Sequence, residues 1–145
     1  MASTNATSYT NKFLPPVGSG NTVTLHAQID VAANPTANDT VKLFHEDVLR
    51  NLRLVDLNVG ATADMDSSTD FAFTIRANDG STQQNILASS TILQGTTAAT
   101  GIGLGAAVGY KFTGTHWIEL LWTVDSAGFT AGVVNVVATF VRDQF

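Results

Sequence analysis

The stretch TVTLHAQIDV, residues 22–31, decides the fold class of this chain. Apolar side chains occupy every second position of it, and polar side chains stand between them. The apolar set is Val23, Leu25, Ala27, Ile29 and Val31. Successive side chains of a β-strand point to opposite faces, so this period of two predicts a strand with one buried and one solvated face.

The same alternation returns further along the chain. It predicts strands over residues 40–44, 52–59, 71–77, 116–124 and 130–141. Within 52–59 the parity of the apolar residues changes between Leu54 and Val55, which predicts a β-bulge at that point. Segments rich in Asn, Asp, Pro and Gly separate the strands, because these residues suit the backbone of turns. Residues 45–51 read as a connector with room for one helical turn.

Two segments leave their structure open. Residues 83–94 fit either a short helix or a loose strand, and residues 96–109 consist almost wholly of Gly, Ala, Thr and small aliphatic side chains. The remaining pattern, seven or eight short strands without a long helical period or an internal repeat, predicts an all-β fold, namely a β-sandwich of the jelly-roll type.

Composition limits the functions that this domain can have. Only 13% of the 145 residues are charged, against about 25% in a typical protein, and the formal net charge is −5. The seven Lys and Arg residues are scattered, so the sequence offers no basic surface for nucleic acid or for an anionic membrane. With no cysteine, no disulfide or thiolate metal site can form.

The first 20 residues differ from the rest of the chain. They are polar, contain Pro15 and Pro16, and precede the first periodic strand. We expect residues 1–20 to form an extended N-terminal arm that orders only against a partner, and residues 21–145 to form the sandwich domain. Tyr9, Phe13 and Leu14 are the candidate anchors of the arm on that partner. The alternative is a frayed terminus without a binding role.

The last predicted strand suggests a second binding surface. One of its faces carries Val134, Val136, Ala138 and Phe140, which suit the core. The other face is half apolar, and its valines are candidate partner-binding residues: Val133, Val137 and Val141. Isolated apolar residues are also common on ordinary surfaces, so both readings stay open. Open sheet edges and the half-apolar face lead us to expect a homo-oligomer, namely a trimer.

No group of residues points to catalysis, to a cofactor or to a metal. The densest acidic and histidine cluster is His45-Glu46-Asp47, which reads as a solvated turn. Asp64, Asp66 and Asp70 resemble a calcium loop only loosely, because the sharp-turn glycine and the closing glutamate are missing. Glu119 stands in an apolar strand, where a buried carboxylate with a raised pKa could be functional, but a side chain that faces outward or pairs with a cation is more common. The sequence contains neither a nucleophile elbow nor a phosphate-binding loop.

Four segments together resemble the small virion proteins of tailed bacteriophages. They are NDTVKL at 38–43, NLRLVDLNV at 51–59, TIR at 74–76 and AGVVNVVATF at 131–140. The chain departs from that family's pattern at Asn38, where the family has Gly, and at 47–52, which lacks the family's Pro-x-Gly turn. These residues are similar to those of capsid decoration, or cement, proteins.

The resemblance implies a function and its partners. It implies a β-sandwich that binds the outside of a phage capsid, with the major capsid protein and other copies of the chain as partners, and it implies no catalytic residue. Within the same class, the chain could be another minor virion structural protein. From a different class comes a carbohydrate-binding β-sandwich module, for which Trp117 or Trp122 could supply a platform. Because the two tryptophans have opposite parity, at least one should be buried.

Overall fold

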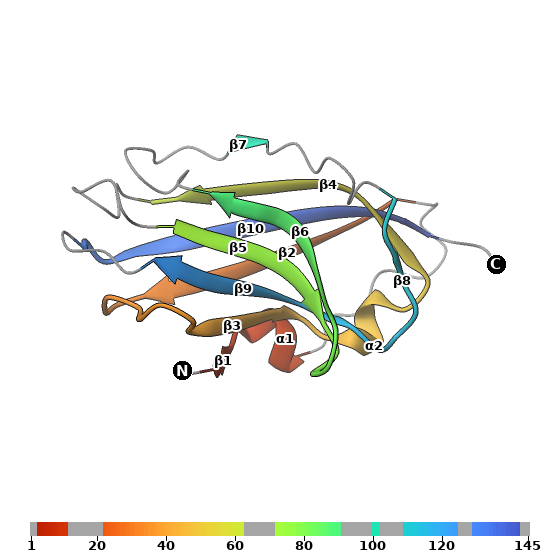
Figure 1. Ribbon diagram of the computed structural model, residues 1–145. Helices are drawn as coiled ribbons and strands as arrows, with labels where there is room; N and C mark the ends of the chain where they lie inside the picture. The colour runs from red at the N-terminus through yellow and green to blue at the C-terminus, as the bar shows by residue number, and fades with distance from the viewer. Residues whose placement is uncertain are drawn as a thin grey trace.

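In the computed structural model the predicted strands form two sheets that pack face to face (Figure 1). The structure describes residues 3–11, 22–62, 72–90, 100–101, 109–124 and 129–142. One sheet has the order β1-β3-β9-β5-β6, with β1 Ser3–Asn5, β3 Thr40–Phe44, β9 Trp117–Val124, β5 Ala72–Asn78 and β6 Gln83–Ser90. The other has the order β2-β10-β4-β7, with β2 Thr22–Val31, β10 Gly132–Arg142, β4 Leu52–Ala61 and β7 Thr100–Gly101.

Three short elements complete the described part of the chain. The strand β8, Lys111–Phe112, pairs with the beginning of β4. The helix α1 spans Thr7–Asn11, and the helix α2 spans Glu46–Leu49 inside the predicted connector. His45 caps α2, since its Nδ1 accepts a hydrogen bond from the backbone N–H of Asp47 at 3.1 Å.

The strand pairing is that of a jelly roll. Apart from β1 and β8, eight strands pair from the outside inward: β2 with β10, β3 with β9, β4 with β7 and β5 with β6. This is the pattern obtained when one long hairpin is wound into two sheets, as in jelly rolls. The predicted all-β jelly-roll sandwich is therefore confirmed.

Individual strand predictions are also confirmed. In β2 the burial of side chains alternates strictly over ten residues, as the opening stretch predicts. The predicted bulge lies at Val55, because Thr139 pairs with Asp56 while the next residue, Phe140, pairs with Leu54. The ambiguous segment resolves as a strand over Gln83–Ser90, and residues 91–94 lie outside the described residues.

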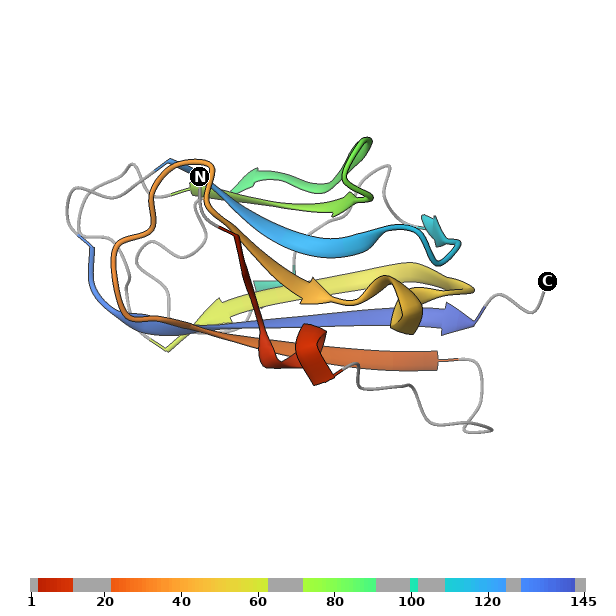
Figure 2. The same ribbon diagram turned by 90° about the horizontal axis from the view of Figure 1, so that it is seen from below.

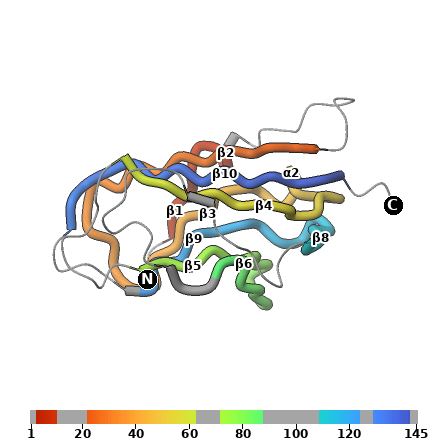
Figure 3. The backbone as a smooth tube through the Cα atoms, turned by 90° about the horizontal axis from the view of Figure 1, so that it is seen from above, coloured from red at the N-terminus to blue at the C-terminus, as the bar shows by residue number. Residues whose placement is uncertain are grey.

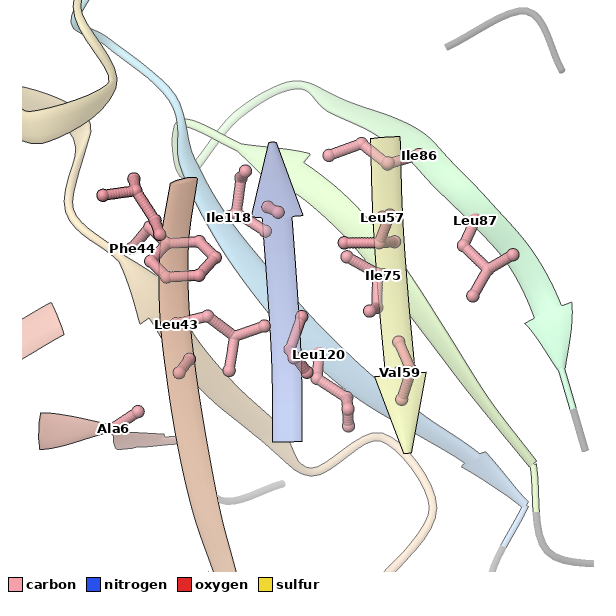
Figure 4. Close-up of a cluster of buried hydrophobic side chains, with 14 of the residues drawn as sticks. Ala6, Leu43, Phe44, Leu57, Val59, Ile75, Ile86, Leu87, Ile118 and Leu120 are labelled. Carbon is pink, nitrogen blue, oxygen red and sulfur yellow. The ribbon is translucent and has the colours of Figure 1, made fainter. Parts of the chain in front are cut away.

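Apolar side chains from both sheets fill the space between them (Figure 4). On one side are Leu43, Ile75, Ile118 and Leu120, and on the other are Leu57 and Val59 of β4, all almost inaccessible to solvent. The predicted core face of β10 is fully buried, and Phe140 meets Phe112 edge to face with ring centroids 6.1 Å apart. Burial of this kind is the main term that stabilises a fold without disulfides.

The described part of the predicted arm lies on the domain itself, which differs from the expectation that residues 1–20 order only against a partner. The strand β1 pairs in parallel with β3, and α1 contacts both β2 and β3 (Figure 2). Ala6 is buried and donates its backbone N–H to the Lys42 carbonyl at 2.8 Å, and the Ser8 hydroxyl donates to the Leu43 carbonyl at 2.7 Å. The β1–β3 ladder, these two hydrogen bonds and the buried Ala6 are the contacts that order this segment against its own domain.

Candidate functional site

Tyr9, one of the predicted anchors, lies in α1 and contacts other residues of its own domain. Its ring stacks at a tilt on His45, with centroids 4.9 Å apart, and the Lys42 ammonium lies 5.5 Å from the ring centre. Partial burial raises the pKa of the Tyr9 hydroxyl, and the Glu46 and Asp47 carboxylates raise it further. Tyr9 therefore joins the N-terminal segment to β3 and to the cap of α2.

Lys42 connects Tyr9 to a second aromatic ring. Its Nζ lies 4.1 Å from the centre of the Trp117 ring, within the range of a cation–π contact. Lys42 and Trp117 both lie on the face of their sheet that is turned away from the core, since their strand neighbours Leu43 and Ile118 are the buried ones. One ring face of Trp117 is consequently occupied by a side chain of the protein.

Glu119 is the centre of a buried polar group on this same outward face. It is only 2% exposed, and it stands directly opposite Lys42 on β3 and Arg76 on β5. The Arg76 Nε and Nη2 each lie 2.7 Å from Glu119 Oε2. The Asn78 amide donates to both carboxylate oxygens at 3.2 Å, and the Trp117 indole N–H donates to Oε1.

We call Lys42, Arg76, Asn78, Trp117 and Glu119 the Glu119 cluster. Both oxygens of its carboxylate accept hydrogen bonds, and the charge is balanced by Arg76. A general base needs a free lone pair within reach of a substrate, and this carboxylate offers none without breaking the cluster. Glu119 is buried on the outward face of its sheet, and its expected pairing with a cation is confirmed by Arg76. The contacts within the cluster hold the strands β3, β9 and β5 in register.

The loop between β5 and β6 contains a second ordered carboxylate. Asp79 accepts hydrogen bonds from the backbone N–H groups of Thr82 at 2.6 Å and Ser81 at 2.8 Å, and from the Thr82 hydroxyl at 2.8 Å. These hydrogen bonds, that of the Thr82 N–H first, lower the pKa of Asp79 to about 2. His116 Nε2 lies 3.6 Å from the same carboxylate. The arrangement closes a tight turn in which Gly80 has a φ of +93°.

The predicted valines form a row on the outward face of β10. Val133, Val137 and Val141 are partly exposed, and two of them flank Asn135, whose side chain lies 3.0 Å from His26 Nε2. On the adjacent strand β2, the residues that pair with these three valines are, in the same order, Asp30, His26 and Thr22. At four residues apart, successive valines are separated by ~13 Å, so polar groups divide the row and no continuous apolar patch results.

Several of the predicted site residues lie outside the part of the chain that the structure describes. Phe13 and Leu14, together with the loosely calcium-like Asp64, Asp66 and Asp70, lie outside the described residues. Among the residues that are described, no group of three or more His, Asp or Glu side chains is placed to hold a metal ion. No helix in that part of the chain has the length and hydropathy needed to cross a membrane.

Sequence reasoning missed Lys42 and Arg76 as members of a site. A signal was present, because Lys42, Arg76 and Glu119 are charged residues that each stand within an apolar strand. Opposite charges on adjacent strands attract when they fall in register. Only the order β3-β9-β5 shows that the three residues are neighbours, and that order is a property of the topology.

Comparisons with known proteins agree with the fold. No protein-family model and no curated protein matches the sequence. A solved chain from the capsid of Ralstonia phage GP4 matches with a TM-score of 0.75 at 12% identity, over 99% of this chain and 100% of that one. A chain from the capsid asymmetric unit of cyanophage Pam1 matches with a TM-score of 0.67 at 17% identity, over 88% and 90%. Both of these solved structures are of phage capsids, the kind of particle that the sequence resemblance indicates.

Proposed function

We propose that this chain is a non-enzymatic structural protein of a phage virion that binds the outside of the capsid and stabilises it, as decoration or cement proteins do. The observation that carries the proposal is the near-complete match in fold, end to end on both chains, to a component of a phage capsid. Low charge and a domain built around one apolar core suit a subunit that docks on a protein shell.

The partners follow from the same proposal. They are the major capsid protein and further copies of this chain, arranged as a trimer. The partly exposed Val133, Val137 and Val141 support a contact surface on the β10 face, because partly apolar surface with a polar rim is typical of non-obligate interfaces. Tyr9 supports attachment indirectly, by holding the N-terminal segment on β3.

The two tryptophans give the carbohydrate-binding alternative little support. Trp122 is 2% exposed and packs edge to face on Phe73 in the core, as the opposite parity of the two tryptophans predicts for one of them. Trp117 has the Lys42 ammonium over its ring. One ring is thus buried and the other has one face occupied, and no observation on the described residues favours this function.

A sedimentation experiment tests the proposal. Capsids of the source phage assembled without this chain are mixed with the purified chain and pelleted. We expect saturable binding at a fixed ratio to the major capsid protein, together with a rise in the temperature at which the capsids break. A chain that stays in the supernatant at every concentration contradicts the proposal.

A pair of variants tests the β10 surface. Val137→Glu places a charge on the outward face of β10, and Gln84→Glu adds the same charge at an exposed position of the other sheet. We expect Val137→Glu to weaken capsid binding by about tenfold, since ~1.4 kcal/mol is lost when a carboxylate is desolvated at an interface rim, and Gln84→Glu to bind as the wild type does. Equal binding of the two variants would place the contact elsewhere.

A further inference from the structure

The strand β2 has the longest edge without a partner in the described part of the chain. It forms the border of its sheet and, among the described residues, pairs only with β10, over ten residue pairs without a register shift (Figure 3). The other borders are blunted: β1 has three residues, β7 has two, and β6 is interrupted by register shifts against β5. Native proteins blunt free edges in these ways, since an open edge pairs with other chains.

The free hydrogen-bonding groups of this edge can be assigned. The Val133 carbonyl accepts from the Thr62 N–H at 3.0 Å, and the Val133 N–H donates to the Thr62 hydroxyl at 3.0 Å, so its main chain faces the β4 side. Asp30 pairs with Val133 across the ladder and therefore directs its own N–H and carbonyl away from β10. By the period of two, the same holds for the other polar residues of the strand: Thr22, Thr24, His26 and Gln28.

A groove of about 700 Å³ lies along this edge. One wall carries His26, Gln28 and Asp30, three of the residues with outward main-chain groups, and the other wall is the segment Thr4–Ser8. Among the described residues that line the groove, Asp30 carries the only formal charge, and none of them is Lys or Arg. The groove thus offers main-chain donors and acceptors at the spacing of a strand, together with one carboxylate.

We propose that β2 accepts one extended polypeptide segment from a neighbouring virion protein as an additional strand, with a Lys or Arg of that segment near Asp30. Addition of a strand to a free edge is a recurring mode of peptide recognition, in which main-chain hydrogen bonds supply affinity. The source of the segment rests on the proposed function, whereas the strand-accepting edge does not.

A folded second copy fits the edge less well than a single extended segment. Two β2 strands joined edge to edge would be related by a two-fold axis perpendicular to the sheet. Both Thr4–Ser8 walls would then approach the axis from the same face of the joined sheet. Because Thr7 and Ser8 line the groove together with residues 26 and 28–30 of β2, the two walls would approach each other wherever the two strands pair over this segment. An extended segment brings no such wall.

The edge is tested first without capsids, by amide exchange and a synthetic probe. In the dilute chain we expect fast exchange at Thr24, His26, Gln28 and Asp30 and slow exchange at Leu25, Ala27 and Ile29. The probe is the peptide Lys-Val-Thr-Val-Thr-Val-Lys. Adding it should shift and protect the first set of amides by about tenfold, as expected for groups that become hydrogen-bonded. Fast exchange that the saturating peptide leaves unchanged overturns the proposal.

A second copy as the occupant would give a different result. Protection of the same amides would then rise with the concentration of the chain alone, in step with a doubling of mass in light scattering. That outcome overturns the proposal in favour of self-association. Protection that is already present in the dilute monomer overturns it as well, since the edge would be covered by the chain itself.

Capsid binding separates this inference from the proposed function. Gln28→Pro removes one outward N–H without touching the ladder to β10, and edge strands tolerate proline where the N–H faces outward. Gln28→Ala is the matched control, since it removes the side chain and keeps the N–H. We expect Gln28→Pro to bind capsids at least about tenfold more weakly than Gln28→Ala.

Each remaining outcome decides one of the two claims. If both variants bind equally, the capsid does not use this edge and the inference fails while the proposed function stands. If neither the wild type nor the variants bind, the proposed function fails and the peptide experiment still decides whether the edge accepts a strand. Should Gln28→Pro not fold, protection of the outward amides in the capsid-bound wild type decides the same question.

Discussion

Glu119 shows how one residue can fix the register of three strands. Its carboxylate lies between Lys42 and Arg76 on the neighbouring strands and accepts hydrogen bonds from Arg76, Asn78 and Trp117. A register slip of β9 by one residue would turn this carboxylate into the apolar core. The cluster thus penalises slipped pairings, which suits a strand whose other residues are almost all apolar.

Removal of the Glu119 carboxylate should destabilise the fold. We expect Glu119→Ala to lower the free energy of unfolding by about 3 kcal/mol, because Arg76 and two polar groups are left without their acceptor in a buried setting. Gln83→Ala, which removes an exposed acceptor 3.3 Å from the same arginine, should change it by less than about 0.5 kcal/mol. Urea unfolding measures both, and similar midpoints for the two variants would contradict this role of Glu119.

Asp79 gives a prediction on pH. The pKa of the Asp79 carboxyl is about 2 in the folded chain, whereas the ordinary value is 3.8. The ionised carboxylate therefore stabilises the fold above pH 3.8. That contribution should be lost as pH falls from about 4 to about 2, because protonation removes the charge that the Ser81 and Thr82 N–H groups bind. Asp79→Asn should flatten the pH dependence of the urea midpoint in this range. An NMR titration that gives Asp79 an ordinary pKa would contradict the assignment.

At the scale of the element, the two faces of β10 differ sharply. Val136 is fully buried, whereas its neighbour Val137 is partly exposed on the outward face. We expect Val136→Thr to lower the free energy of unfolding by about 2 kcal/mol, because the substitution buries a hydroxyl without a partner in the core. Val137→Thr should be almost neutral, since its hydroxyl reaches solvent. Thermal or urea unfolding of the pair checks this, and equal losses would mean that the outward face is covered.

The N-terminal segment gives the second prediction at this scale. Deleting residues 2–11 removes β1, α1 and the two hydrogen bonds that Ala6 and Ser8 make to β3. At about 1 kcal/mol for each hydrogen bond, together with the buried Ala6, the truncated chain should lose about 2–3 kcal/mol of stability. Ser8→Ala alone should lose about 1 kcal/mol. An unchanged unfolding midpoint for the truncated chain would restore the interpretation of this segment as an independent arm.

Elements with a clear period were predictable, and those held by tertiary contacts were not. The strict alternation of β2 fixes both its type and its buried face, and the parity change at Val55 marks a bulge before any pairing is known. The segment Ser3–Asn11 has no such period. Its order depends on hydrogen bonds that the Ala6 N–H and the Ser8 hydroxyl donate to the carbonyls of Lys42 and Leu43, which lie more than 30 residues away.

At the scale of the whole molecule, strand number and turn chemistry sufficed to predict a jelly-roll sandwich. They could not give the pairing of each strand, so the approach of Lys42, Arg76 and Glu119 was hidden although each residue stands out in its own strand. The same holds for the edge of β2 that has no partner among the described residues. Its ten-residue length is visible in the sequence, but its position at the border is a product of topology.

Quantitative mass spectrometry of purified particles of the source phage, with the major capsid protein as the internal standard, tests whether this domain is a structural part of a phage particle. We expect this chain to be present in many copies, in a constant ratio to the major capsid protein, and to remain on the particles after washing. Its absence from purified particles would rule out a structural role in the virion.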